Sequence, residues 1–548
     1  MIAIQRLIEA DAVSRLVRRD ASLFAPDFEK RKSISNRLGW TDLAERGDLR
    51  APLVETLKRA ITEEGATDVV LLGMGGSSLA ALVFERVFGT QVEGLKLHVL
   101  DTVDPQTVAK LMAELTPANT WFLLSSKSGA TIEPLSLYRV FRAWMNEHME
   151  GPAAGKRFVV ITDPDSPMQA LRTKEFMRMA INAPANVGGR YSALSLFGLT
   201  PAGLLGVDLK ALLKVARAME VECAKPAEEN PAAKLAAWIA DNHTDGRDKL
   251  TFIASPGLES FGLWVEQLVA ESTGKSGIGV VPVIADPADD LAGLGSDRAV
   301  FIMRDANDPA LAELTAALQG AGHPVFEVTI DDRLALGAEF VRWKYATGLL
   351  GFLMGIDPFD EPNVSEAKQA TLEVLEGKAS PPPAVVDIDG VWPAYAGVFE
   401  GANPPADLTS ALAPLAATRR PGDYLAVLVY LPYDDALVEP LRAALRKVTA
   451  TTTIPSILQF GPRYLHSTGQ LHKGGPDNGA FLVITARDKT RIPVPGSPYT
   501  LGELYRAQAE GDFMALGAHN RRVMRLDLPD TRKPTIARLA LAIEAALG

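Results

Sequence analysis

The chain has 548 residues, of which 47% are hydrophobic and 22% charged, the balance of a globular protein with two or three domains. Its net charge of −11 and the lack of any Lys/Arg-rich stretch exclude non-specific nucleic-acid binding. A single cysteine, Cys223, excludes an internal disulfide and a cysteine-built zinc site. With no run of 18 apolar residues and no signal-peptide layout at its start, the sequence predicts a cytoplasmic protein that does not bind a membrane.

The first 65 residues have apolar side chains at helical spacing, and short apolar runs then alternate with helical patterns. This alternation is typical of βαβ units that build a parallel sheet. The first set of expected strands is 68–75, 96–101, 120–127 and 157–163. A long helical region, 194–242, precedes a second set at 250–255, 279–285, 299–304 and 324–330, which helices at about 333–355 and 361–377 close. We expect two similar doubly wound halves.

A proline-rich segment, EGKASPPPAVVDIDG at 376–390, is typical of a linker. Beyond it, strand-like runs at 424–432, 451–461 and 480–488 again alternate with helical patterns. The sequence therefore predicts an α/β protein in three parts. These are N-terminal helices with a first doubly wound parallel-sheet domain (1–240), a second such domain (241–378) and a C-terminal α/β extension (391–548).

Two loops that follow expected strands are rich in glycine and hydroxyl side chains. LLGMGGSSLA, 71–80, runs from a strand through Gly76 into a helix that begins near Ser77, so its backbone amides suit an anion. FLLSSKSGATIEPL, 122–135, places polar side chains at the C-terminal end of a second strand, where ligands bind in open parallel sheets. These side chains are Ser126, Lys127, Ser128 and Thr131. Hydroxyls, a lysine and helix amides favour phosphate; the alternative is two capped helices with a solvated lysine.

Two further stretches carry a single charged candidate each. In VGGRYSALS, Arg190 follows two glycines, which would let the backbone pack closely around a ligand. In VEQLVAESTGKSG, Glu271 ends a helix, where its charge opposes the helix dipole. Taken alone, these patterns are more typical of a surface arginine and a solvated glutamate.

Five motifs in the same order make the chain similar to the glucose-6-phosphate isomerase family, which has the sugar-isomerase fold. The resemblance covers roughly residues 35–375. Its motifs are GMGGS at 73–77, SKS at 126–128 with Thr131 and Glu133, GGRYS at 188–192, ESTGK at 271–275 and AKQ at 367–369. The resemblance implies two sugar-isomerase domains and a reversible aldose–ketose isomerisation of glucose 6-phosphate and fructose 6-phosphate, a reaction of glycolysis and gluconeogenesis.

The resemblance also implies roles for the candidate residues. Glu271 would move the proton between C2 and C1, and Arg190 would stabilise the enediolate. Lys368 and a histidine would open the sugar ring. The phosphate would be bound by Gly76, Ser77, Ser126, Lys127, Ser128 and Thr131. We expect no metal and no cofactor.

The chain departs from the family at the ring-opening histidine, which the family carries shortly after the glutamate motif. Here that segment, ADPADDLAGLGSDRAVF at 285–301, contains no histidine. YLHSTGQLHKGGP, 464–476, offers His466 and His472 instead, and its STGQLH resembles the missing motif. We expect the extension to fold back over the site with His472, rather than His466, as the catalytic group. The alternative is a turn with incidental histidines.

The extension resembles the C-terminal portion of bifunctional transaldolase/glucose-6-phosphate isomerase proteins, although we find no transaldolase barrel.

A non-catalytic sugar-phosphate-binding regulator and a phosphoglucose/phosphomannose isomerase stay as alternatives; Glu271 and Arg190 favour an enzyme. The expected partner is a small sugar phosphate. The family is commonly dimeric, with the histidine crossing the interface, so a homodimer stays open, but a histidine supplied in cis would remove that requirement.

Overall fold

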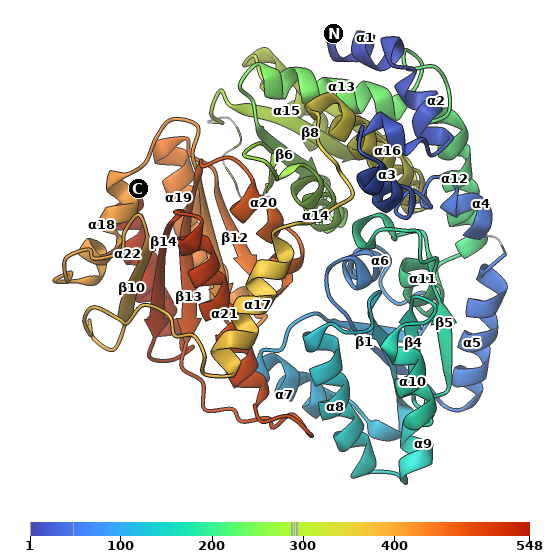
Figure 1. The fold of residues 1–548 in the computed structure, drawn as a ribbon, viewed down its shortest axis with the longest axis horizontal. Coiled ribbons are helices and arrows are strands. Elements are labelled where there is room, and N and C mark those ends of the chain that lie inside the picture. Colours follow the sequence, from blue (N-terminus) through green and yellow to red (C-terminus); the bar gives the residue numbers. More distant parts are fainter. Residues whose placement is uncertain (1, 48, 286–288, 290, 292–293) are drawn as a thin grey trace.

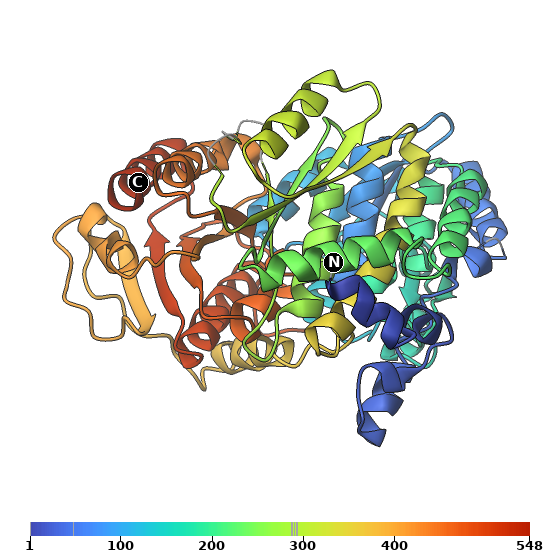
Figure 2. The ribbon, with the colours of Figure 1, turned by 90° about the horizontal axis from the view of Figure 1, so that it is seen from above.

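The computed structural model describes residues 2–47, 49–285, 289, 291 and 294–548, and this part of the chain forms three open sheets covered by helices. In Figure 1 the C-terminal sheet lies on one side of the molecule, and the other two lie together on the opposite side. Figure 2 gives the same separation from above. The predicted α/β class, with two parallel-sheet units and a C-terminal α/β extension, is confirmed. No helix of the described residues has the length and apolar character needed to cross a bilayer.

The first sheet is parallel, with strand order β2-β1-β3-β4-β5. Its strands are β1 (Asp68–Leu72), β2 (Lys96–Leu100), β3 (Thr120–Ser125), β4 (Phe158–Thr162) and β5 (Met179–Asn182). Leu72 pairs with both Leu100 and Leu124, so the loops after β1, β2 and β3 leave the sheet at one edge. β5 was not predicted, because it is a short strand with only one fully buried residue and carries no apolar run.

Helices precede and cover this sheet, as the N-terminal helical pattern predicts. The N-terminal helices are α1 (Ile2–Glu9), α2 (Ala12–Val17), α3 (Phe28–Ser35), α4 (Leu43–Gly47) and α5 (Ala51–Glu63). Those that follow strands are α6 (Leu79–Phe88), α7 (Pro105–Glu114), α8 (Ile132–Asn146), α9 (Gly151–Gly155) and α10 (Pro167–Lys174). The expected helical region 194–242 forms α11 (Leu196–Leu204), α12 (Leu209–Glu222) and α13 (Pro231–Thr244).

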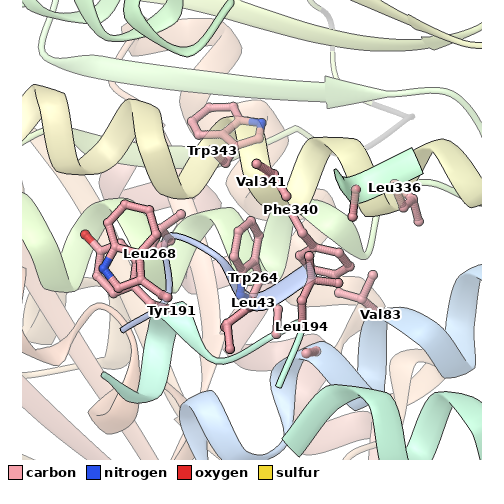
Figure 3. Close-up of a cluster of buried hydrophobic side chains, with 14 of the residues drawn as sticks. Leu43, Val83, Tyr191, Leu194, Trp264, Leu268, Leu336, Phe340, Val341 and Trp343 are labelled. Atoms are coloured by element: carbon pink, nitrogen blue, oxygen red, sulfur yellow. The ribbon is translucent and has the colours of Figure 1, made fainter. Parts of the chain in front are cut away.

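The second sheet is also parallel, in the order β7-β6-β8-β9. Its strands are β6 (Lys249–Ala254), β7 (Val281–Ile284), β8 (Arg298–Asp305) and β9 (Val325–Ile330), and its helices are α14 (Phe261–Thr273), α15 (Pro309–Gly320) and α16 (Leu336–Met354). Figure 3 shows Trp264 of α14 and Phe340 of α16 inside the apolar cluster that joins this unit to the first. Their rings meet edge to face, with centroids 4.7 Å apart. This packing fixes α14, whose last turn carries Glu271.

The C-terminal sheet has the order β10-β14-β13-β11-β12, with β10 antiparallel to β14 and the other pairs parallel. Its strands are β10 (Trp392–Gly397), β11 (Tyr424–Tyr430), β12 (Ser456–Phe460), β13 (Gly479–Ala486) and β14 (Arg522–Leu528). Its helices are α18 (Leu408–Ala417), α19 (Asp435–Thr452), α20 (Gly469–Gly474), α21 (Leu501–Ala518) and α22 (Lys533–Leu547). β10 and β14 were not predicted, because β10 contains a proline and β14 is interrupted by charged residues.

Helix α17 (Val364–Leu375), expected to close the second unit, packs instead along α21 of the C-terminal unit (Figure 1). A Cβ atom on Gly511 of α21 would lie 2.7 Å from the backbone nitrogen of Thr371, so only glycine lets the two helices approach this closely. Side chains of the first sheet, among them Phe122, share one buried cluster with Tyr430 and Tyr505 of the C-terminal unit. The C-terminal unit is therefore packed into the core, and the boundaries at 240, 378 and 391 stay predictions.

Candidate active site

A cavity of about 500 Å³ is lined by loops from all three units. It opens at the edge of the first sheet where β1 and β3 end. Most of the predicted site residues line it: Gly76, Ser77, Lys127, Ser128, Thr131, Arg190, Glu271, Lys368 and His466. Ser126 and His472 lie elsewhere, as described below.

The loops after β1 and β3 form one wall of this cavity. The Ser125 hydroxyl donates to the carbonyl oxygen of Ser77 (2.9 Å), which holds the two loops together. A Cβ atom on Gly76 would lie 2.2 Å from the carbonyl carbon of Gly189, so the first loop touches the GGRYS loop only because this residue has no side chain. Thr131 is the N-cap of α8, and helix N-termini favour anions. The wall therefore has the donors that a phosphate group requires.

Ser126 and Lys127 act differently from the two hydroxyl residues that follow them. Ser126 is buried; its hydroxyl bonds to the Thr131 hydroxyl (2.9 Å) and accepts from the Gly129 amide (3.2 Å). It shapes the loop and does not line the cavity. Lys127 lines the cavity, pairs with Asp163 and donates to the carbonyl oxygen of Ala185 (3.0 Å). Its ammonium group is held in place beside the hydroxyls.

Arg190 is a fixed cation on the second wall, with only 3% of its surface exposed. Its Nη2 donates to two backbone carbonyls of the turn at 358–360, at 3.0 and 2.8 Å. Its Nη1 donates to Glu361 Oε2 (3.0 Å) and lies 3.2 Å from Glu271 Oε1. Because every arm of the guanidinium is held, it does not need to reorganise when negative charge develops nearby.

Glu271 lies in the last turn of α14 and lines the cavity with a buried carboxylate. Gln267, one turn earlier, donates to its Oε2 (3.2 Å). Burial and the charge of Glu361 raise the pKa of Glu271, and they outweigh the opposite effect of Arg190. A carboxylate with a raised pKa is a better proton acceptor and donor near neutral pH than an ordinary one.

Removing the charge of Glu361 tests whether the surroundings of Glu271 raise its pKa. Glu361→Gln removes a negative charge that raises the pKa of Glu271, so that pKa should fall. Since a general base acts in its ionised form, the acidic limb of the kcat–pH profile should then move to lower pH. The profile of the variant is measured beside that of the wild type. A limb that stays in place or moves to higher pH would contradict the assignment of Glu271 as the titrating base.

His466 reaches the cavity from the C-terminal unit, at the end of a 3-10 helix (Arg463–His466). Its Nε2 lies 2.8 Å from Glu133 Oε1, and its carbonyl oxygen accepts from Gln267 Nε2 (2.7 Å). Gln508 of α21 also donates to Glu133 Oε1 (2.7 Å). Burial alone would raise the pKa of Glu133, but the neighbouring His466 and Lys368 outweigh it and the pKa is lowered. An ionised carboxylate therefore orients the imidazole, and Gln267 links this histidine to Glu271.

His472 does not reach the cavity, which reverses the expected preference for it over His466. It lies in α20 with 1% of its surface exposed, and its ring packs among Tyr424, Tyr464 and Phe481. Neither ring nitrogen has a hydrogen-bond partner among the described residues. Burial, with the charge of Lys473 as a smaller cause, lowers its pKa well below the usual value. His472 is a core residue, and of the two candidate histidines it is His466 that lines the cavity.

Several residues that line the cavity or support it were not predicted. Asn36 and Arg37 come from the N-terminal segment after α3, and Arg37 pairs with Glu361 (2.8 Å). Glu133 was part of a quoted motif, but its contact with His466 joins two units and no local pattern reveals it. Of the histidine-free segment 285–301, residues 286–288, 290, 292 and 293 lie outside the described residues.

A wall of hydroxyl and amide donors at a parallel-sheet edge, a buried carboxylate and a fixed guanidinium are together typical of an α/β enzyme of acid–base chemistry. Comparisons with known proteins name the family. The family model "Phosphoglucose isomerase" matches residues 55–281. A glucose-6-phosphate isomerase of Thermus thermophilus is 30% identical over 393 residues, which cover 64% of this chain and 92% of that protein. The corresponding enzyme of Rubrobacter xylanophilus is 28% identical over 362 residues, which cover 57% of this chain and 83% of that protein.

The chain belongs to the phosphoglucose isomerase family. Among solved structures, a hypothetical protein from Thermus thermophilus is 29% identical with a TM-score of 0.59, over 68% of this chain and 96% of that one. A glucose-6-phosphate isomerase from Chlamydia trachomatis shares the fold, with 17% identity and a TM-score of 0.53, over 68% and 83%. The family-model match ends before the C-terminal unit begins.

Proposed function

We propose that the protein is a glucose-6-phosphate isomerase, which interconverts glucose 6-phosphate and fructose 6-phosphate through an enediolate. Membership of the family supports the reaction, and one observation in the structure carries its assignment to this cavity. Glu271, buried and with a raised pKa, lies 3.2 Å from the fixed guanidinium of Arg190, opposite an anion-binding wall.

The sugar phosphate would bind first through its phosphate group. Ser128, Thr131 and Lys127, with the amides of the loop at 73–77, form the pocket for this group. Because the phosphate does not react, these contacts hold the substrate in one orientation and raise the effective concentration of its reacting carbons. The sugar carbons would then extend toward Glu271 and Arg190.

His466 and Lys368 would open the pyranose ring, one removing the proton of the C1 hydroxyl and the other supplying a proton to the ring oxygen. Glu133 would fix the orientation of the imidazole through their 2.8 Å contact. Glu271 would then take the proton from C2 and return it to C1. The negative charge that forms on the enediolate oxygens would be stabilised by Arg190.

A coupled assay tests this function directly: glucose 6-phosphate formed from fructose 6-phosphate is oxidised by a dehydrogenase and followed by absorbance. We expect turnover with and without EDTA, because the side chains that line the cavity supply an acid, a base and a cation. A protein that binds both sugar phosphates without turnover would be the non-catalytic regulator. Mannose 6-phosphate in the same assay shows whether the second isomerase activity is present.

The phosphate wall gives a second prediction. The double variant Ser128→Ala/Thr131→Ala should raise KM more than it lowers kcat, because these hydroxyls bind a group that does not change during the reaction. Each lost charge-assisted hydrogen bond is worth about 1.5–3 kcal/mol, so KM should rise ~10-fold or more. Steady-state kinetics measure both constants. A variant with an unchanged KM would contradict the phosphate assignment.

We further propose that each chain carries a complete site, because His466 and Glu271 belong to the same chain and are linked by Gln267. Mixing Glu271→Gln chains with His466→Ala chains, after partial denaturation and refolding together, should then restore no activity. If the histidine came from a partner chain, mixed dimers would contain one intact site and would recover activity. A homodimer stays compatible with this proposal but is not needed for catalysis.

The C-terminal unit that supplies His466 also supports a finer proposal about lineage. We propose that the chain is of the type found as the isomerase part of bifunctional transaldolase/glucose-6-phosphate isomerase proteins. Its three described sheets are open, and a transaldolase barrel would require about 250 further residues. A transaldolase assay on the 548-residue chain should therefore be negative.

A further inference from the structure

The three units repeat one strand order. With the four parallel strands of each unit taken from one edge, the orders are β2-β1-β3-β4, β7-β6-β8-β9 and β12-β11-β13-β14. In each unit the chain passes from one central strand to the edge strand beside it and then returns to the other side of that central strand. The strand order therefore reverses between β1 and β3, between β6 and β8 and between β11 and β13, and ligands bind in the crevice at such a reversal. In the first unit, the active-site cavity is lined by the loops that follow β1 and β3.

A second cavity, of about 410 Å³, occupies the equivalent place in the C-terminal unit. Tyr430 at the end of β11 pairs with Thr485 in β13, so the two strands end level, and both residues line the cavity. The loop that follows β13, 487–491, forms a second side. The N-terminus of α7, from the first unit, forms a third. We call this cavity the C-terminal crevice; it shares no lining residue with the active site within the described part of the chain.

Cationic side chains gather in the C-terminal crevice, in a chain whose net charge is −11. Arg487 stacks over the Trp392 ring at 4.4 Å, and Arg506 is held by Asp527 (3.0 Å). Lys489 and Arg491 are exposed and form no ion pair within the described residues. Two cations are thus fixed in place and two can turn toward a ligand.

The carboxylates of the crevice are engaged by backbone amides. Asp104 accepts from the Thr107 amide (2.7 Å), and Asp488 accepts from the Thr490 amide (2.9 Å). Glu503 accepts from the Thr500 amide (2.7 Å) in a capping box. These hydrogen bonds partly satisfy the carboxylates, so the crevice keeps its cations for an anion.

We infer that the C-terminal crevice is a second binding site, for a small phosphorylated metabolite. It lies where β11 and β13 end and the strand order reverses, which is where ligands bind in open parallel sheets. This position does not depend on the isomerase reaction. Its volume is close to that of the active-site cavity, about 410 against 500 Å³. Guanidinium and ammonium groups around one opening are groups that bind phosphate in proteins.

Equilibrium dialysis of the full chain against radiolabelled inorganic phosphate, at low ionic strength, tests the inference. The wild type should bind two equivalents. Lys489→Ala/Arg491→Ala should weaken one of them about tenfold or more, and Ser128→Ala/Thr131→Ala should weaken the other. The matched control is Lys210→Ala/Lys214→Ala, which removes two exposed charges from α12 and should leave both equivalents intact. The exchange Lys489→Arg/Arg491→Lys keeps the charges and should also keep both.

Two results would overturn the inference: a wild type that binds one equivalent, removed by the Ser128/Thr131 variant, or a Lys489/Arg491 variant that keeps both equivalents. Circular dichroism and isomerase activity of the Lys489/Arg491 variant show that it is folded. If the protein has no isomerase activity but still binds the phosphate equivalent that depends on Lys489 and Arg491, the proposed reaction is wrong. The proposal of a binding site in the C-terminal crevice then remains supported.

Discussion

Glu271→Gln is expected to lower kcat by ~10²–10⁴-fold, the usual contribution of a general base, and to leave KM nearly unchanged. Glutamine keeps the size of the side chain and an oxygen that can accept from Arg190, but it cannot take a proton. Exchange of solvent tritium into C2 of the substrate should be lost to the same extent. Steady-state kinetics and the exchange assay are measured on one preparation.

The chain offers a matched control on the same helix. Glu266 is a partly buried carboxylate of the same helix, α14, but it accepts a hydrogen bond from Gln459 and does not line the active-site cavity. Burial raises the pKa of Glu266 to about 7, and the pKa of Glu271 is also raised. Glu266→Gln should therefore leave proton exchange at C2 intact. Wild-type turnover in Glu271→Gln, or equal losses in both variants, would remove Glu271 from the mechanism.

His466→Phe is expected to slow turnover of the cyclic substrate by ~10²-fold or more, because ring opening loses its acid–base group. Exchange of the C2 proton in an open-chain analogue should fall much less, since that step belongs to Glu271. The ratio of the two rates is the measurement, because a general disturbance of the fold would lower both together.

His472→Phe provides the control for His466→Phe. The same substitution is made six residues away, but the His472 ring already packs among aromatic side chains, and its nitrogens have no hydrogen-bond partner among the described residues. Phenylalanine should fill this place without leaving a buried polar atom unpaired. The rate ratio should match that of the wild type. If His472→Phe changes the ratio and His466→Phe does not, the assignment of ring opening to His466 is wrong.

The sequence predicted strands well wherever a buried strand is also a continuous apolar run. β1, β3, β4 and β11 are continuous apolar runs, which parallel sheets covered by helices require. β10 and β14 were missed, because β10 is stabilised by its pairing with β14, and β14 by this pairing and by the burial of Arg522 and Arg525; neither effect leaves an apolar run in the sequence. Local patterns therefore report apolar runs, but they report neither strand pairing nor the burial of charged side chains.

Local patterns were limited in the same way for the candidate active site, because they do not report contacts between distant parts of the chain. The residues on the loops after β1 and β3 could be predicted, since the strand ends and the family motifs coincide there. The different positions of His466 and His472 could not be predicted, because they depend on a contact between His466 and Glu133, a residue more than 300 positions away, and on the burial of His472 in the next helix, α20. Ser126 shows a related failure: four hydroxyl and amino side chains in six positions look equivalent, yet one of them is used to shape the loop.

The way the C-terminal unit completes the active site has a consequence for synthesis of the protein. Chains are made from the N-terminus, and domains generally fold in that order. By the end of α16 a nascent chain already contains the phosphate-binding wall, Arg190 and Glu271. It still lacks His466, and it lacks Gln508, which helps to hold Glu133. A ribosome-bound or prematurely released chain would therefore bind sugar phosphate without converting it, and catalytic activity would appear only in molecules whose synthesis has been completed.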